Sequence, residues 1–312
     1  MNRYNKLNAF LKNKFGERVL KICIDGGFTC PNRDGKCGRG GCIYCGERGS
    51  GENTKRIDIK DQVNNFINSY RGQRANKYIA YFQNFTNTYD SVDNLREKYN
   101  SALVDKRIVA LAIATRPDCV SQEVADLLKE YVLQGLYVWV ELGLQTVNEE
   151  VAKTINRGYT NQDFKNAVEL LQASCVDVVT HIMIGLPGEE PNDLKDALDF
   201  VNAQKVNGIK FHSTYVIKNT ALEQMYNSGT YKTIDLECYI ENVLYALTHL
   251  RKDIVVHRIT GDAPKDLLVA PSFCAHKKQV MNRIENVMEN DNLYQGMYLD
   301  WLSFTQRKRY KK

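Results

Sequence analysis

One stretch of this chain constrains its fold and chemistry more than any other. Residues 25–51 read DGGFTCPNRDGKCGRGGCIYCGERGSG and hold four of the nine cysteines, Cys30, Cys37, Cys42 and Cys45. The abundance of Gly, Asn, Asp and Arg in this stretch is typical of a loop and not of a helix or a strand. Loops that gather soft ligands usually hold a metal centre. We therefore expect the rest of the chain to be organised around a site at this loop.

Two kinds of metal centre are compatible with these cysteines. Structural zinc would take all four as thiolates, but such sites commonly use two CxxC pairs, and here only Cys42 and Cys45 form one. A [4Fe–4S] cluster would use Cys42 and Cys45 as the close pair and Cys30 as the third ligand. Three protein ligands leave one iron open to a substrate or a cofactor, which would make the cluster a reagent.

The remaining composition is that of an ordinary soluble globular protein. The net charge of +5 is mildly basic and does not by itself predict nucleic-acid binding. The basic residues 307–312, RKRYKK, are interpreted as a solvated end, with an RNA contact as the alternative. Neither a signal peptide nor a membrane-spanning apolar run is visible, so we expect a cytoplasmic protein. There, nine cysteines favour metal ligands, catalytic groups or small buried residues over disulfides.

Apolar runs alternate with amphipathic patterns along most of the chain, which indicates a parallel sheet covered by helices. Strands are predicted at Val19–Asp25, Lys77–Gln83, Arg107–Ala114, Leu136–Leu142, Val176–Ile184 and Gly208–Val216. Helices are predicted at Leu7–Phe15, Asp58–Arg71, Ser91–Ala102, Ser121–Gln134, Asn161–Ala173 and Asn192–Gln204. A further helix (Asp235–Leu250), strand (Asp253–Arg258) and late helix (Asn282–Glu289) follow.

These elements predict an α/β fold, a partial (β/α)6 TIM-like barrel with a C-terminal extension. We expect one domain over residues 1–312, comprising an N-terminal helix (1–18), a barrel core (about 19–216) and the extension (about 217–312). Catalytic residues of such barrels lie at the C-terminal ends of the strands. Polar residues stand at each predicted strand end: QNFTNTY (83–89), TRPD (115–118), Glu141 with Gln145, GLPG (185–188), and Lys210, His212 and Tyr215. Each could be an ordinary loop residue, but their agreement predicts a site at this mouth.

The sequence resembles one protein family over nearly its whole length. The spacing Cys30-x11-Cys42-x2-Cys45 is followed in order by YFQNFTNTY, ATRPD, VWVELGLQT, INRGY, IGLPGE and RITGDAPKDLLVAP. Together these motifs are similar to those of the radical S-adenosylmethionine (SAM) superfamily, in its YhcC/YtqA-like subgroup with an expanded cysteine loop. The resemblance implies the partial barrel, a [4Fe–4S] cluster held by Cys30, Cys42 and Cys45, and SAM bound at the open iron. Cys37 lies outside the three-cysteine pattern and is interpreted as a bystander.

The resemblance also implies contacts to SAM. Tyr44 would lie near adenine, although a buried aromatic without a ligand is the alternative. Gln83 and Asn84 would contact the methionine amino group, and Glu141 the ribose or the amino group. Further candidates are Thr115, Arg116 and Gln145, and an arginine here could pair with the SAM carboxylate. The backbone of Gly185, Leu186 and Pro187 would approach adenine. A flavodoxin or ferredoxin is implied as electron donor.

Substrate contacts are expected from the strand ends and the C-terminal extension. The candidates are Asn87, Tyr89, His212, Tyr215, Arg258 and Asp262. The Asp262 carboxylate could accept a guanine-like pair of N–H groups, or Gly261 and Asp262 could simply form a tight turn. A core histidine is the alternative for His212.

Two activities follow from the resemblance. The first is a lyase that cuts the cyclopentenediol from the aminomethyl nitrogen of queuine and leaves 7-aminomethyl-7-deazaguanine for queuosine salvage. The second trims carboxymethylaminomethyl-uridine in tRNA to aminomethyl-uridine. The modest charge and the lack of an evident RNA-binding domain favour the small-molecule substrate queuine. A regulatory protein with structural zinc is the alternative of a different class.

Overall fold

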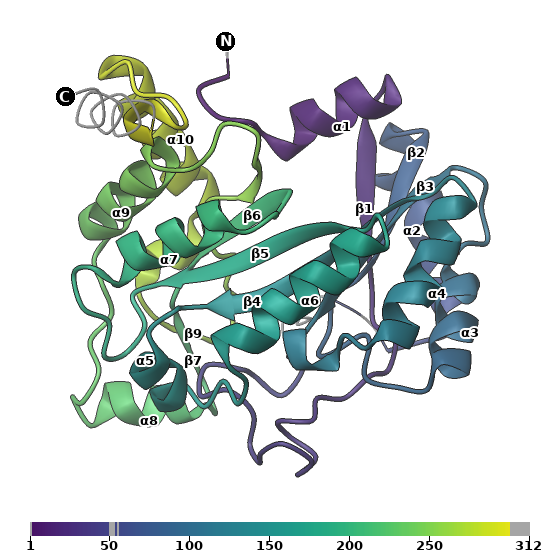
Figure 1. The fold of residues 1–312 in the computed structure, drawn as a ribbon. Helices are drawn as coiled ribbons and strands as arrows, with labels where there is room; N and C mark the ends of the chain where they lie inside the picture. Colours follow the sequence, from purple (N-terminus) through teal and green to yellow (C-terminus); the bar gives the residue numbers. More distant parts are fainter. Residues whose placement is uncertain (1, 50–53, 55, 300–312) are drawn as a thin grey trace, which may run out of the picture.

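A curved sheet of seven parallel strands forms the centre of the protein (Figure 1). In spatial order they are β1 (Val19–Ile24), β2 (Lys77–Phe82), β3 (Ile108–Thr115), β4 (Tyr137–Gln145), β5 (Asp177–Ile184), β6 (Gly208–Ser213) and β8 (Val255–Arg258). The structure is a computed structural model that describes residues 2–49, 54 and 56–299. The basic residues 307–312 lie outside this range. The predicted α/β partial barrel is confirmed.

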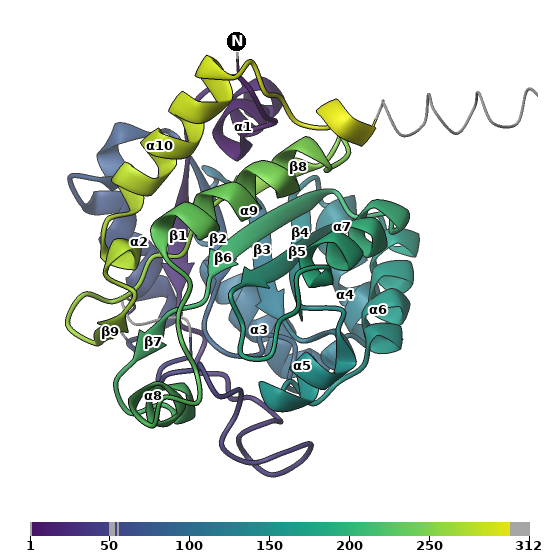
Figure 2. The ribbon, with the colours of Figure 1, turned by 90° about the vertical axis from the view of Figure 1, so that its left-hand side faces the viewer.

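Helices cover the outer face of the sheet and the ends of the barrel (Figures 1 and 2). They are α1 (Leu7–Phe15), α2 (Ile59–Asn68), α3 (Val92–Ala102), α4 (Gln122–Leu133), α5 (Glu149–Thr154), α6 (Asn161–Ala173), α7 (Asp193–Ala203), α8 (Ala221–Asn227), α9 (Leu236–Thr248) and α10 (Lys277–Asn290). Among the described residues, none of these helices is long and apolar enough to cross a membrane.

Local sequence signals explain where several helices begin and end. The Ser121 hydroxyl accepts a hydrogen bond from the Val124 N–H at the start of α4, as predicted. Thr160 and Asp163 form a reciprocal capping box at α6. Helix α1 ends at Gly16, whose φ of 79° is the left-handed conformation that glycine adopts most readily.

The two faces of the sheet bury different cores because strand side chains alternate in direction. On β4, Val138 and Val140 belong to the outer core under the helices, whereas Trp139 belongs to an inner core inside the barrel. Leu7 and Leu11 of α1 also join the inner core. Helix α1 therefore fills the N-terminal end of the barrel and leaves the opposite end for chemistry.

The barrel is open between its two edge strands, β1 and β8, which are the two ends of the strand order. The segment before α1 contacts the β8 side, because Val256 N–H donates to the Asn5 carbonyl at 2.7 Å. In the described part of the chain the sheet is therefore not closed, and residues 5 and 6 lie along its β8 edge.

The structure differs from the predicted elements mainly after β5. The predicted seventh strand joins the barrel sheet beside β6 instead of lying apart in an extension. The predicted strand Gly208–Val216 is split into β6 and β7 (Val216–Ile217), and β7 pairs antiparallel with β9 (Leu268–Ala270). Short helices α5 and α8 were not predicted, because six or seven residues carry too little periodicity.

Candidate active site

The cysteine loop follows β1 and lies at the end of the barrel opposite α1 (Figure 2). Cys30, Cys42 and Cys45 are half-buried, whereas Cys37 is exposed. The loop lies beside α5 and α8 (Figure 1). It therefore occupies the mouth where the other predicted site residues end their strands.

Amide side chains attach this loop to the connection between α5 and α6. Asn32 Nδ2 donates to the Asn156 carbonyl at 2.6 Å, and Asn156 Nδ2 donates to the Gly41 carbonyl at 2.8 Å. The backbone N–H of Ile43 donates to the Ile155 carbonyl at 3.1 Å. Gly38 is required for space, since a Cβ there would lie 2.2 Å from Asn32 Oδ1. The loop is held by long-range contacts in place of regular secondary structure.

The three half-buried thiols fit a cluster-binding role. Burial, with the neighbouring Cys45, raises the pKa of the Cys42 thiol to about 11, and a metal centre would be needed to hold it as a thiolate at neutral pH. Asn32 Nδ2 lies 3.8 Å from Cys42 Sγ, as hydrogen-bond donors around cluster sulfurs do. Within the described residues, no three His, Cys, Asp or Glu side chains form a site for a single metal ion.

Two asparagines in the segment that follows β2 have buried amide oxygens. Asn84 Nδ2 donates to Asp25 at 3.0 Å and Thr54 at 2.9 Å, and Asn87 Nδ2 donates to the carbonyl of Ala114 at 2.7 Å. The Oδ1 atoms of both asparagines are buried without a hydrogen-bond partner in the described part of the chain. A buried acceptor without a donor costs about 1–3 kcal/mol, so a ligand N–H would be bound favourably. Asn84 and Asn87 remain predicted contacts to SAM and substrate, respectively.

Arg116, predicted to face the SAM carboxylate, is buried and already bonded. Its guanidinium donates to both Asp118 oxygens at 2.9 and 2.8 Å, and to the carbonyls of Arg157 and Gly158 at 2.9 and 3.2 Å. These bonds support the connection that holds the cysteine loop. The structure therefore favours a positioning role for Arg116. The Thr115 hydroxyl lies 2.6 Å from that of Thr88.

A tyrosine beside the cysteine loop organises the end of β4. Tyr159 Oη lies 2.9 Å from both the Gly143 carbonyl and Gln145 Oε1, and Gln145 has a left-handed φ of 60°. The pKa of Tyr159 lies well above its usual range. Burial is the main cause, and the nearby Cys42 adds to it. Gln145 is thus held beside the cysteines, and its contact to SAM remains a prediction.

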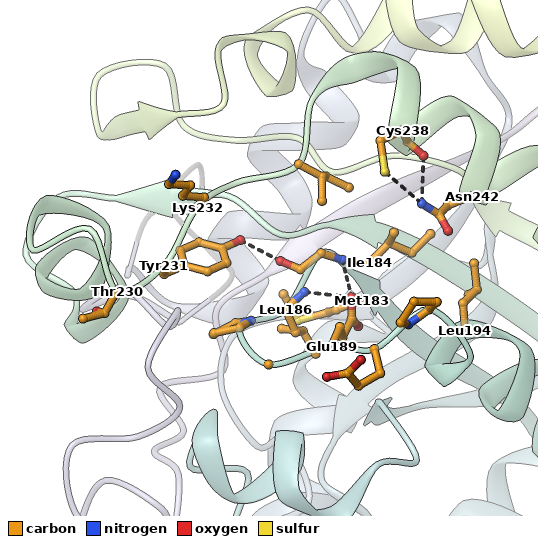
Figure 3. Close-up of a pocket in the computed structure, with 16 residues that line it drawn as sticks. Met183, Ile184, Leu186, Glu189, Leu194, Thr230, Tyr231, Lys232, Cys238 and Asn242 are labelled. Atoms are coloured by element: carbon orange, nitrogen blue, oxygen red, sulfur yellow. Dashed lines mark hydrogen bonds between the residues drawn. The ribbon is translucent and has the colours of Figure 1, made fainter.

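The GLPG segment after β5 lines a cavity of about 450 Å³ (Figure 3). The Glu189 carboxylate accepts hydrogen bonds from the N–H groups of Gly185 and Leu186 at 2.6 and 3.0 Å, and Tyr231 donates to the Gly185 carbonyl at 2.6 Å. Burial raises the pKa of Glu189 to about 7. Pro187 belongs to the same lining. Contact of this segment with adenine remains a prediction.

Deeper in the barrel, Glu141 is the centre of a polar cluster. Its Oε2 accepts hydrogen bonds from Tyr81 at 2.7 Å, His181 at 3.1 Å and the Lys210 ammonium, with which it forms a buried ion pair. Its Oε1 accepts from Trp139 at 3.2 Å and lies 3.6 Å from Lys21 Nζ. We expected Glu141 to contact SAM, but both of its oxygens are occupied, which favours a role in arranging the interior cations.

The charge states of this cluster follow from burial and from its ion pairs. Burial would raise the Glu141 pKa, but Lys210, Lys21 and His181 hold it well below its usual value. Burial lowers the pKa of Lys210 to about 7 and that of His181 to about 4. His181 is therefore neutral near pH 7.

Three of the predicted substrate residues lie in two different places. The ring centroids of His212 and His181 are 5.2 Å apart, and Arg258 is the register partner of Lys210, so His212 and Arg258 belong to the interior cluster. Asp262 is instead exposed and pairs with Lys277 of α10 at 3.1 Å. This position does not favour the guanine contact that we expected for Asp262.

The remaining predicted residues lie in several places. Tyr89 lines a second cavity, of about 420 Å³, with Cys37 and Cys119. Tyr44 and Ile43 pack against the small apolar cores around Val216 and Leu186. Gln83 directly follows β2, and Tyr215 packs half-buried against the main core. Sequence reasoning missed Lys21, Tyr81 and Asn32 as site residues. Inward alternation along β1 and β2 was the available signal for the first two.

Comparison with known proteins agrees with this arrangement. Residues 34–201 match the Radical SAM superfamily, and residues 206–290 match the Radical SAM C-terminal domain. The chain belongs to the radical SAM superfamily, and its cofactors are a [4Fe–4S] cluster and SAM. It is thus a radical SAM enzyme and not the zinc-binding regulatory protein considered as an alternative.

The predicted similarity to the YhcC/YtqA-like subgroup is confirmed. The chain is 38% identical to YtqA of Bacillus subtilis over 303 residues, which are 96% of this chain and 94% of YtqA. It is 34% identical to YhcC of Escherichia coli K12 over 305 residues, 97% and 98% of the two chains. The structure of Elp3 from the archaeon Methanocaldococcus infernus shares the fold, with a TM-score of 0.68 at 22% identity, over 89% of this chain and 64% of Elp3.

Proposed function

We propose that this radical SAM enzyme trims carboxymethylaminomethyl-uridine in tRNA to aminomethyl-uridine. One similarity carries the proposal. The chain is 34% identical over 169 residues to a Methanocaldococcus jannaschii protein named tRNA uridine(34) acetyltransferase, covering 53% of this chain and 30% of that protein. The name places that protein's reaction on a tRNA uridine. This preference reverses our expectation from the sequence alone, which favoured queuine.

The charge of the barrel interior supports the same choice. Lys21, Lys210 and Arg258 are three basic side chains around one carboxylate, that of Glu141, and burial lowers the pKa of both lysines. The carboxymethylaminomethyl arm carries a carboxylate, whereas the cyclopentenediol of queuine is uncharged. An interior with surplus positive charge binds the anionic arm more favourably.

The chain's own residues would divide the work between the mouth and the interior. With the cluster and SAM bound, the site would supply a 5′-deoxyadenosyl radical that removes a hydrogen atom from the arm carbon next to the nitrogen. Loss of one electron from that carbon to a one-electron carrier, followed by addition of water, would break the carbon–nitrogen bond. The arm would leave as a two-carbon aldehyde acid, and the uridine would keep a primary amine. Cys30, Cys42 and Cys45 would hold the cluster, and Asn84, Gln145 and the GLPG backbone would hold SAM. The interior residues would orient the arm, and a flavodoxin or ferredoxin would deliver the electron.

Queuine lyase is the second candidate, and two observations favour it. The match to the tRNA enzyme covers only 30% of that protein, so most of its length has no counterpart here. A net charge of +5 is also small for a protein that neutralises several tRNA phosphates. Cleavage of queuine would be chemically parallel, because a secondary amine again loses its substituent.

The deciding experiment offers both substrates to the anaerobic holoenzyme with SAM and a reductant. We expect mass analysis of the digested tRNA to show aminomethyl-uridine. Queuine should remain intact. Conversion of queuine alone would establish the second candidate. Conversion of neither substrate, while 5′-deoxyadenosine forms, would reject both. A Cys42→Ala variant serves as the inactive control.

A further inference from the structure

The barrel interior below the mouth contains more positive than negative charge. Lys21 and Lys210 both approach Glu141, and Arg258 is the register partner of Lys210 on the next strand. Burial lowers the pKa of the neighbouring imidazoles of His181, His212 and His257, so these three groups are uncharged near pH 7. Three basic groups thus surround a single carboxylate. Burial lowers the pKa of Lys210 to about 7 and also lowers that of Lys21, so a bound anion would favour the charged forms of both lysines.

Several polar groups of this interior have no partner. Within the described residues, the half-buried guanidinium of Arg258 makes no hydrogen bond or ion pair. His212 Nε2 and His257 Nδ1 are buried and also have no hydrogen-bond partner in this part of the chain. Buried polar groups are nearly always satisfied, so these atoms indicate a place for a polar ligand.

The position of this group suits a substrate that enters from the mouth or from the side. Lys21 and Lys210 each stand three residues before the last residue of their strands. At about 3.3 Å per residue they lie roughly 10 Å below the strand ends. Solvent also reaches this depth, because Cys23 of the edge strand β1 is exposed and the Lys21 side chain is 24% exposed.

We propose that Lys21, Lys210 and Arg258 form a carboxylate-binding chamber inside the barrel, with Glu141 as the fixed anion that holds the two lysines. The identity of the anion as the carboxylate of the substrate's carboxymethyl arm rests on the proposed function. Arg258 is the group able to bind a carboxylate bidentately, since its fork of N–H donors is not engaged by the described residues.

SAM also carries a carboxylate, and depth distinguishes the two sources. Cys30, Cys42 and Cys45, which would hold the cluster and the iron that SAM chelates, lie in the loop beyond the end of β1. The chamber lies lower in the same barrel, on the side of α1. The chamber therefore holds the substrate's carboxylate.

Alkylation of Cys23 tests the chamber without any need for turnover. Iodoacetate is an anion and iodoacetamide is neutral. The same thiolate attacks the methylene carbon of either reagent and displaces iodide, so the ratio of the two rates does not depend on the thiolate fraction. In the anaerobic holoenzyme we expect this ratio at Cys23 to exceed that at the exposed Cys175 by about tenfold, as electrostatic focusing typically gives. Peptide mass spectrometry resolves the two sites.

Variants of Arg258 test whether this residue causes the preference of Cys23 for iodoacetate. Arg258→Gln should bring the Cys23 ratio toward that of Cys175, whereas Arg258→Lys should keep most of the preference. Arg283→Gln is the matched control, because Arg283 pairs with Glu237 on the surface. Equal ratios at Cys23 and Cys175 in the wild type, or an unchanged ratio in Arg258→Gln, would overturn the chamber.

Added ligands distinguish the carboxylate of SAM from that of the substrate arm. They also test the chamber separately from the proposed function. SAM alone should leave the iodoacetate preference intact, and an anticodon stem-loop carrying carboxymethylaminomethyl-uridine should remove it. Loss of the preference with SAM alone would overturn the substrate assignment. A preference that no RNA affects, with no RNA converted, would reject the proposed function while supporting an anion-binding chamber.

Discussion

Lys210 on β6 and Glu141 on β4 form an ion pair across the inside of the barrel, with both side chains almost completely buried. The Lys210 ammonium also donates to Tyr81 Oη at 3.1 Å, and Tyr81 in turn donates to Glu141. The pair joins three strands of the sheet through one carboxylate. Its removal therefore affects both the stability of the barrel and the charge of its interior.

Glu141→Gln should destabilise the protein, because it leaves Lys21 and Lys210 without their anion. Breaking a buried pair on one side typically costs about 3–5 kcal/mol. We expect a lower Tm in anaerobic thermal unfolding and a partial recovery in the double variant Glu141→Gln/Lys210→Met. Glu130→Gln, which removes an exposed partner of Arg96, should leave Tm unchanged. A wild-type Tm in Glu141→Gln would show that the pair contributes little.

Arg116→Lys should weaken cluster binding strongly and lower Tm only slightly. Lysine cannot reproduce the bidentate contact to Asp118 together with the two carbonyl contacts beside the cysteine loop. Bound iron per protein after anaerobic reconstitution measures the effect. Arg107→Lys is the matched control, since Arg107 binds Asp105 in the same way but far from the site. Equal iron content in the two variants would contradict the positioning role.

Glu189→Gln should remove a pH dependence of stability. The pKa of Glu189 is raised from 4.5 to about 7 in the folded state, so its contribution is fully present below pH 4.5 and is lost as the pH rises to about 7. A glutamine oxygen can still accept from Gly185 and Leu186. We expect the variant to gain up to about 3 kcal/mol of stability at pH 8 and nothing at pH 4.5. An equal Tm difference at both pH values would contradict the raised pKa.

Single alanine substitutions of Cys30, Cys42 and Cys45 should each abolish cluster binding and the formation of 5′-deoxyadenosine, because these three thiolates would be the protein's only ligands to the cluster. Cys37→Ala should keep both, as the exposed thiol lies outside the ligand set. Iron content and product formation are the two measurements. Full activity in any of the first three variants would reject that ligand.

Local sequence patterns were sufficient to predict most of the helices and strands. Helix α6 spans the predicted Asn161–Ala173, and α1 ends before Gly16 as its left-handed glycine predicts. These features depend on periodicity and capping within a few residues, which a sequence displays directly. The elements after β6 were harder, since β7 is only two residues long and is defined by its partner β9.

The candidate site likewise has one part that the sequence predicted and one part that it did not. The spacing of Cys30, Cys42 and Cys45 indicated the cofactor chemistry from the sequence by itself, because the three ligands come from one loop. Only the tertiary structure joined Lys210 to Glu141 and Tyr81, which are 69 and 129 residues away from it, and left Arg258 beside them without a partner in the described chain. Contacts between inward-facing side chains depend on strand order and register, which no local pattern encodes.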